Sequence, residues 1–341
     1  MSQTPIRVGL IGAGSVSGAH LPAYQQFPEQ VQLVAVADPV EELARQRAEQ
    51  GGAERVYTDP YRMIQEAPID AVDICAPHFL HAPLALAAIE AGKHVLVEKP
   101  MGITWEECRQ MVEAADRAGV TLMAAQCLRY YPKYRAVRRA IQEGELGRIF
   151  SVEFASIQDL RRLRPPGNWM FDGKKNGGGT VIGLAVHSID LVRYYLGNVR
   201  RVSALCKTMR PEYINGAEDY AVATMEFEND ALGSLFSTNS CHATPWGHRF
   251  YILGESGAIH NTAIASRRRG SDGRFVELEP EREGLPTDDG FVNEILHWAD
   301  CCRTGAEPIS SGRDNLETMR VIFGIYESSR RGGAPVELAS L

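Results

Sequence analysis

The chain has 341 residues, 44% of them hydrophobic and 23% charged, which is the composition of an ordinary globular protein. This length exceeds what one hydrophobic core usually supports, so two domains are expected. The formal net charge of −7 argues against nucleic acid or an anionic membrane as a partner.

The seven cysteines are scattered along the chain and lack paired CxxC spacing. This pattern indicates neither a disulfide framework nor a zinc site, so we expect no metal ion and reduced thiols in a cytoplasmic protein. The first apolar run, residues 6–11, leads into a glycine turn and not into a signal-peptide cleavage site. The sequence contains no apolar run of about 18 residues, so no membrane span is predicted.

A glycine-rich turn follows the first predicted strand, residues 7–11, and precedes a helix. In such a turn the backbone N–H groups at the helix N-terminus suit the diphosphate of a dinucleotide. The predicted contacts are Gly12, Gly14, Ser15 and Val16. Ser17 stands where the fingerprint G-x-G-x-x-G has its third glycine, and a small side chain there still allows close packing.

Asp38 ends the second predicted strand, residues 31–37, about 20 residues after Gly18. A carboxylate at this place accepts hydrogen bonds from the adenine ribose and repels a 2′-phosphate, so NAD is favoured over NADP. The competing interpretation is a turn former before Pro39.

Predicted strands alternate with helices as far as residue 125, which indicates parallel βαβ construction and an N-terminal domain over residues 1–125. Residues 126–341 form the second predicted domain, an α+β unit. Its segment 199–278 alternates in a strand-like way and predicts a large, mostly antiparallel sheet.

The segment 92–101 holds a buried strand that ends on Glu98, Lys99 and Pro100. In open parallel sheets, ligands bind at the carboxyl ends of the strands. Lysine suits a reacting carbonyl or alkoxide, because it is a compact cation whose pKa burial can lower. The alternative is a surface Glu–Lys pair that merely ends a strand.

Two sets of histidines are candidate site residues, one after the strand 70–76 and one on a later helix. His78 and His81 come after the strand 70–76, beside the expected cofactor, although His81 equally suits a backbone hydrogen bond. His187 and, three residues later, Asp190 lie on nearly the same face of an apolar helix that follows three glycines. We interpret His242 and His248 as loop or substrate-pocket residues.

The sequence resembles the Gfo/Idh/MocA family, named after glucose-fructose oxidoreductase, inositol dehydrogenase and rhizopine catabolism. The matching residues span nearly the whole chain in family order: Gly12, Gly14, His20, Asp38, Ala76-Pro77-His78-x-x-His81, Glu98-Lys99-Pro100, Arg129-Tyr130-x-Pro132, Gly177-Gly178-Gly179, His187-x-x-Asp190 and Tyr326-x-Ser328. The resemblance implies an N-terminal Rossmann domain with a doubly wound parallel sheet. It also implies a C-terminal domain whose open sheet packs against another subunit in a homodimer or homotetramer.

By this resemblance Lys99 is the catalytic lysine, and His187 exchanges a proton with the substrate hydroxyl. The implied cofactor contacts beyond the glycine turn and Asp38 are Ala76, Pro77, His78, His81, Glu98 and Lys99. The implied substrate contacts are Lys99, Arg129, Trp169, Lys174, Gly183, His187, Asp190 and Tyr326. Two positions depart from the family pattern: Gly183 replaces an Asp that bonds a substrate hydroxyl, and His78 stands where Asn is common.

We therefore predict an NAD-dependent oxidoreductase that moves hydride between nicotinamide and a sugar- or cyclitol-like secondary alcohol, or the matching ketone. Two alternatives stay open. One is elimination or glycoside cleavage assisted by transient oxidation, and the other is a non-catalytic NAD-binding regulator.

Overall fold

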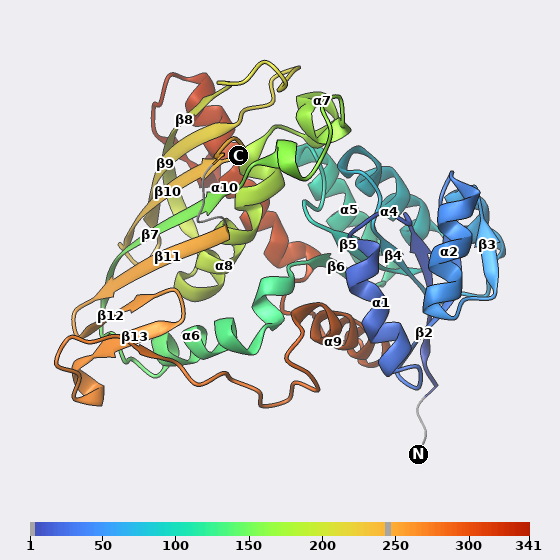
Figure 1. Ribbon diagram of the computed structural model, residues 1–341, viewed down its shortest axis with the longest axis horizontal. Coiled ribbons are helices and arrows are strands. Elements are labelled where there is room, and N and C mark those ends of the chain that lie inside the picture. Colours follow the sequence, from blue (N-terminus) through green and yellow to red (C-terminus); the bar gives the residue numbers. More distant parts are fainter. Residues whose placement is uncertain (1–3, 243–246) are drawn as a thin grey trace. The chain divides into compact units, whose positions relative to one another are not determined.

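The computed structural model describes residues 4–242 and 247–341, and the chain forms two compact units (Figure 1). The first unit comprises residues 1–130 and 286–316, and the second comprises residues 131–285 and 317–341. This division differs from a single boundary at residue 125, because a segment from late in the chain packs with the N-terminal unit. Among the described residues, none of the helices combines the length and apolar character needed to cross a membrane.

The first unit is built on a six-stranded parallel sheet in the order β3-β2-β1-β4-β5-β6. Its strands are β1 (Ile6–Ile11), β2 (Val31–Ala37), β3 (Arg55–Tyr57), β4 (Ala71–Ile74), β5 (His94–Glu98) and β6 (Leu122–Ala125). The helices between them are α1 (Ser17–Gln26), α2 (Glu41–Gly51), α3 (Pro60–Glu66), α4 (His81–Glu90) and α5 (Trp105–Ala118). The order reverses at β1, which confirms the predicted doubly wound Rossmann sheet.

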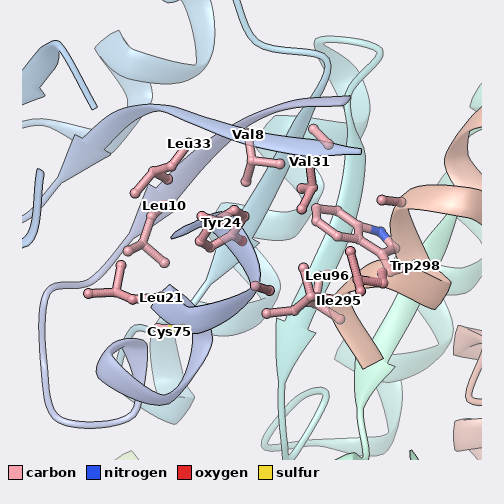
Figure 2. Packing of buried hydrophobic residues seen from close by; sticks show 14 of the residues in the cluster. Val8, Leu10, Leu21, Tyr24, Val31, Leu33, Cys75, Leu96, Ile295 and Trp298 are labelled. Atoms are coloured by element: carbon pink, nitrogen blue, oxygen red, sulfur yellow. The ribbon is translucent and has the colours of Figure 1, made fainter. Parts of the chain in front are cut away.

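Helix α9 (Gly290–Thr304) completes the core of this unit (Figure 2). Its Trp298 and Ile295 are fully buried and belong to the same apolar cluster as Val31 of β2 and Leu96 of β5. Because a buried tryptophan removes a large apolar surface from water, this packing gives a physical reason for residues 286–316 to join the first unit.

The second unit is built on a nine-stranded sheet in the order β14-β13-β12-β11-β7-β10-β9-β8-β15. Its strands are β7 (Ile149–Ile157), β8 (Val199–Lys207), β9 (Tyr220–Phe227), β10 (Leu232–Thr238), β11 (Gly247–Gly254), β12 (Gly257–His260), β13 (Ala263–Ser266), β14 (Val276–Glu277) and β15 (Val336–Glu337). The pair β7/β10 is parallel and the other pairs are antiparallel, so the predicted, mostly antiparallel sheet is confirmed.

The helices of the second half of the chain are α6 (Pro132–Gln142), α7 (Gly173–Asn176), α8 (Val186–Leu196) and α10 (Gly312–Arg330). A short π-helical turn, η5 (Val181–Ala185), leads into α8, which packs against β7. The exposed apolar side chains of the sheet include Leu205, Val222 and Phe236.

Candidate active site

The glycine turn after β1 has the backbone shape that a diphosphate site needs. Gly12 has φ of +96°, and a Cβ there would lie 2.6 Å from the Cys75 carbonyl oxygen, so only glycine fits. Around Gly14 the space is open, since a Cβ there would meet no atom within 4 Å. Ser17 is fully buried and its Oγ donates to the Gly14 carbonyl oxygen at 2.7 Å. The turn therefore keeps an approachable surface at the start of α1, next to Ser15 and Val16.

Asp38 connects the end of β2 to this turn. Its Oδ2 accepts the Ala13 N–H at 2.8 Å, and its Oδ1 accepts the Val40 N–H at 2.9 Å. The carboxylate is half-buried, so it serves as the turn former that the sequence also suggested while standing beside the glycine turn.

Arg47 of α2 is a cation at the turn that sequence reasoning missed. Its Nη2 donates to the Gly14 carbonyl oxygen at 2.9 Å, and its Nη1 donates to Gln50 Oε1 at 2.8 Å. The contact joins residues 33 positions apart, and no spacing rule marks one of the two arginines of α2 in preference to the other.

The turn after β4 contains Ala76, Pro77 and the two predicted histidines. His81 is fully buried; its Nδ1 lies 2.7 Å from the Pro100 carbonyl oxygen and its Nε2 lies 2.8 Å from that of Ala76. Burial lowers the pKa of His81, which favours the neutral ring. His81 therefore ties the turn after β4 to the turn after β5, and the ring of His78 lies 5.5 Å from it.

Glu98 and Lys99 stand at the carboxyl end of β5, as predicted from the strand pattern. Glu98 is buried, and its Oε2 accepts the backbone N–H of Lys99 at 3.0 Å. Lys99 is half-buried; burial lowers the pKa of its ammonium group, and the Glu98 carboxylate opposes this effect. Such a lysine can both stabilise negative charge and exchange a proton.

Arg129 is held inside the first unit. It is buried, its Nη1 donates to the Ile309 carbonyl oxygen at 2.5 Å, and its Nη2 lies 2.6 Å from Asp314 Oδ2. These contacts tie Arg129 to the segment before α10 and to the first turn of that helix, so they give Arg129 a structural role.

In the second unit, His187 lies in the first turn of α8 and is half-buried. Its ring packs edge-on against His248 at the start of β11, with 5.4 Å between the ring centroids. His248 Nδ1 in turn lies 2.7 Å from Ser188 Oγ and 3.1 Å from Ser156 Oγ. Of the two later histidines in the sequence, His248 thus joins His187, whereas His242 is exposed.

The other predicted substrate contacts differ in their surroundings. Asp190 is buried and accepts a hydrogen bond from Thr318 Oγ1 at 2.9 Å. Trp169 is half-buried and Lys174 is exposed. Gly183 lies within η5, where a Cβ would be 3.3 Å from Asn176 Nδ2. The space near Gly183 is therefore partly filled by an amide.

Tyr326 of α10 and Glu218 hold the start of η5. Tyr326 Oη donates to Glu218 Oε1 at 3.2 Å and accepts the Ile182 N–H at 3.2 Å. Glu218 Oε1 also accepts the Val181 N–H at 2.8 Å. Two N–H groups that a helix start leaves unpaired are satisfied in this way.

Comparison with known families decides the relationship. Residues 6–126 match a model described as the oxidoreductase family, NAD-binding Rossmann fold, and residues 134–260 match a GFO/IDH/MocA C-terminal domain. The chain belongs to the Gfo/Idh/MocA family.

Relatives of full length agree with this assignment. The chain is 28% identical over 348 residues to scyllo-inositol 2-dehydrogenase (NAD(+)) of Bacillus subtilis, with 98% of this chain and 96% of the relative covered. It is 30% identical over 354 residues to D-apiose dehydrogenase of Paraburkholderia graminis, with 97% and 89% covered. A solved structure of levoglucosan dehydrogenase with NADH and levoglucosan aligns with a TM-score of 0.89 at 26% identity, covering 98% of this chain and 100% of that one.

The Gfo/Idh/MocA assignment makes the chain a Rossmann oxidoreductase with an NAD-binding domain. The strand-end motif Glu98-Lys99-Pro100 and the glycine turn both lie in the segment that matches the cofactor-binding model. His187 lies in the segment that matches the C-terminal model.

Proposed function

We propose that the protein is an NAD-dependent dehydrogenase for a secondary alcohol of a sugar or cyclitol, or a reductase for the matching ketone, with Lys99 and His187 as its polar catalytic groups. The observation that carries this proposal is the half-buried Lys99 at the carboxyl end of β5, in the same unit as the glycine turn. Relatives named for inositol, apiose and levoglucosan oxidation support the substrate class.

The residues of the turn suit NAD chemically. Gly12 lets the turn pass close to Cys75, Gly14 leaves room for a diphosphate beside the N-terminus of α1, and the Asp38 carboxylate suits the hydroxyls of the adenine ribose. Bound NAD supplies the nicotinamide that accepts or returns a hydride. Since Asp38 would repel a 2′-phosphate, we propose NAD over NADP. A titration that gave equal dissociation constants for the two would contradict this preference.

His187 and Lys99 have different roles in the proposed oxidation of the alcohol. His187 takes the proton of the substrate hydroxyl, which is the usual role of an imidazole near neutral pH. Lys99 donates a hydrogen bond to the oxygen as negative charge develops there, and this stabilisation is large where water is excluded. In the reverse direction His187 returns the proton to the oxygen of the ketone as hydride is added to its carbon, while Lys99 stabilises the charge on that oxygen.

The test is a panel of sugars, sugar acids and inositols with NAD, followed by the absorbance of the reduced cofactor. With the best substrate, Lys99→Ala should lower kcat on the order of 100-fold or more. Lys93→Ala is the matched control, because Lys93 precedes β5 at its other end, where its Nζ donates to the Ile69 carbonyl oxygen at 2.8 Å. Normal turnover by Lys99→Ala would refute the role of Lys99.

Two outcomes would replace the proposed function. Cleavage of a panel member with no net change in NAD would indicate elimination or glycoside cleavage by transient oxidation. Tight NAD binding without turnover of any panel member would indicate a regulator.

A further inference from the structure

Beneath the end of β5 lies a set of buried polar side chains that the proposed mechanism does not use. His20 and Tyr24 come from α1, Asp73 from β4, and Cys75 from the turn that follows β4. His20 and Asp73 are fully buried, Tyr24 is 3% exposed and Cys75 is 6% exposed. Groups this deep in a core need a partner for every polar atom.

The His20 ring lies between two carboxylates. Its Nδ1 is 2.8 Å from Asp73 Oδ2, and its Nε2 is 3.2 Å from Glu98 Oε1. An ionised carboxylate only accepts hydrogen bonds, and a neutral imidazole has only one N–H to donate. When both carboxylates are ionised, the two contacts are therefore satisfied at once only by the doubly protonated ring.

The remaining contacts fit a charged ring. Asp73 also accepts from Tyr24 Oη at 2.8 Å and from Cys75 Sγ at 3.6 Å. Burial opposes the charge on His20, but Asp73 and the neighbouring Cys75 together outweigh the effect of burial, so the pKa of His20 is raised well above its ordinary value. Burial raises the pKa of Cys75 to about 12, so the thiol keeps its proton. From α9 the ring of Phe291, which carries no charge, faces His20 at 5.6 Å between centroids.

We propose that His20 is a positioning residue for Lys99: as a buried imidazolium it holds the Glu98 carboxylate, and Glu98 holds the backbone N–H of Lys99. The contacts run from Asp73 through His20 and Glu98 to Lys99, with charges that alternate in sign. This inference rests on the proposed role of Lys99, since it names what keeps that lysine in place.

Loss of His20 removes the imidazolium that contacts Glu98 Oε1 and leaves this buried carboxylate oxygen without that partner. Such a group either takes up a proton or moves toward water. Both changes disturb the segment 98–99, whereas the glycine turn and Asp38 keep their own contacts with the backbone. We therefore expect that Lys99 is displaced and turnover falls, without a matching loss of NAD binding.

His, Asp and Cys at this spacing also resemble the donor set of a metal site. A metal ion would need His20 Nδ1 without its proton and Cys75 as a thiolate. The full chain is therefore dialysed with and without zinc chloride. Retention of zinc at one equivalent, lost in Cys75→Ser, would overturn the proposal.

The charge state is tested directly by nitrogen NMR of the full chain saturated with NAD, with labelled histidine. At pH 8 both ring nitrogens of His20 should carry a proton, whereas an exposed histidine is neutral at that pH. A neutral His20 ring at pH 8 would overturn the inference.

The positioning role is tested with His20→Asn, and with Glu98→Gln if the first variant does not fold. His20→Asn should lower kcat about tenfold or more, displace the pH profile of kcat, and change the NAD dissociation constant less than about threefold. His94→Asn is the control: His94 begins the same strand and its Nδ1 accepts the Thr121 N–H at 2.9 Å, far from the strand end. An unchanged kcat and pH profile in His20→Asn would overturn the proposal.

A readout that does not depend on turnover separates this inference from the proposed function. Lysines are methylated with a carbon-13 label, and the Lys99 signal is assigned by its loss in Lys99→Arg and titrated. Its midpoint should move by more than about half a pH unit in His20→Asn and stay in place in His94→Asn. If the wild type oxidises no polyol but this shift is seen, the proposed function fails and the positioning role stands. If the wild type oxidises a polyol but the Lys99 midpoint does not move in His20→Asn, the proposed function stands and the positioning role is overturned.

Discussion

The hydroxyl of Tyr326 fills the space that a Cβ at Gly178 would need. From there it contacts Glu218 and the Ile182 N–H, so one side chain of α10 supports both the glycine segment and the start of η5. The neighbouring Gly179 is equally confined, because a Cβ there would meet the backbone of Glu218. The glycines before α8 are thus needed for packing within the second unit.

Gly178→Ala should therefore destabilise the second unit. Residue 178 has φ of +139°, which L side chains rarely adopt, and its new methyl group would displace Tyr326. Overpacking of this kind costs about 1–3 kcal/mol, and the backbone strain adds about 1 kcal/mol. Chemical denaturation followed by circular dichroism measures the change.

Gly216→Ala is the control for the backbone alone, because Gly216 has φ of +86° and a Cβ there would meet no atom within 4 Å. The free energy of unfolding of Gly216→Ala should fall by only about 1 kcal/mol. Equal losses in the two variants would show that contact with Tyr326 does not confine residue 178.

The sequence predicts best what local pattern controls. The glycine turn, the strand that ends at Lys99 and the helix of His187 follow from apolar runs and turn residues, and the structure forms each of them. The partners of these residues come from distant segments: Asp73 lies 53 positions after His20, and Glu98 lies 78 after it. No periodicity encodes such a contact.

The same limit explains two differences in organisation. Helix α9 joins the first unit because Trp298 is buried in its core, yet its amphipathic pattern is equally compatible with the second unit. The sequence shows three glycines before α8, but only the fold reveals Tyr326 and the Glu218 backbone beside two of them, Gly178 and Gly179.

Glu218 should make stability depend on pH. Burial raises the pKa of its carboxyl to about 7, against the opposing hydrogen bonds from Val181 and Tyr326, whereas an unfolded glutamate titrates near pH 4.3. Between these values the folded chain keeps a proton that the unfolded chain releases, so the free energy of unfolding falls as pH rises. The loss reaches roughly 3 kcal/mol by pH 8.

Glu218→Gln removes this titration and keeps an oxygen for the Val181 N–H. Denaturation curves at pH 5, 6, 7 and 8 should show that the free energy of unfolding falls less with rising pH in the variant than in the wild type. Parallel declines in both proteins would mean that Glu218 is ionised in the folded chain throughout this range.

Arg47 should strengthen the binding of ligands that carry a diphosphate. Its guanidinium bonds the Gly14 carbonyl oxygen and adds a positive charge beside the predicted diphosphate position. Arg47→Ala should raise the dissociation constants of NAD and ADP-ribose about five- to twentyfold, corresponding to roughly 1–2 kcal/mol, and leave that of adenosine nearly unchanged. Calorimetric titration measures all three ligands.

Arg45→Ala provides the comparison, because Arg45 lies on the same helix but pairs with Glu41 on the exposed side. It should bind NAD as the wild type does. If Arg47→Ala weakened the binding of adenosine as much as that of NAD, Arg47 would act by stabilising the turn. If the variant bound all three ligands as the wild type does, Arg47 would not be part of the binding site.

The open sheet of the second unit should mediate self-association. Leu205 of β8, Val222 of β9 and Phe236 of β10 are register partners across three neighbouring strands, and their side chains are 46%, 50% and 38% exposed. A row of exposed apolar residues on a sheet is costly in water and is typical of a surface covered by another subunit.

Val222→Arg places a charge in the centre of this row, so light scattering after gel filtration should show a smaller assembly than the wild type. Glu228→Arg, in the turn after β9, is the control and should leave the mass unchanged. An unaltered mass for Val222→Arg would mean that the chain associates through another surface or not at all, because a buried, unpaired guanidinium at the centre of the interface could not be accommodated without a large loss of affinity.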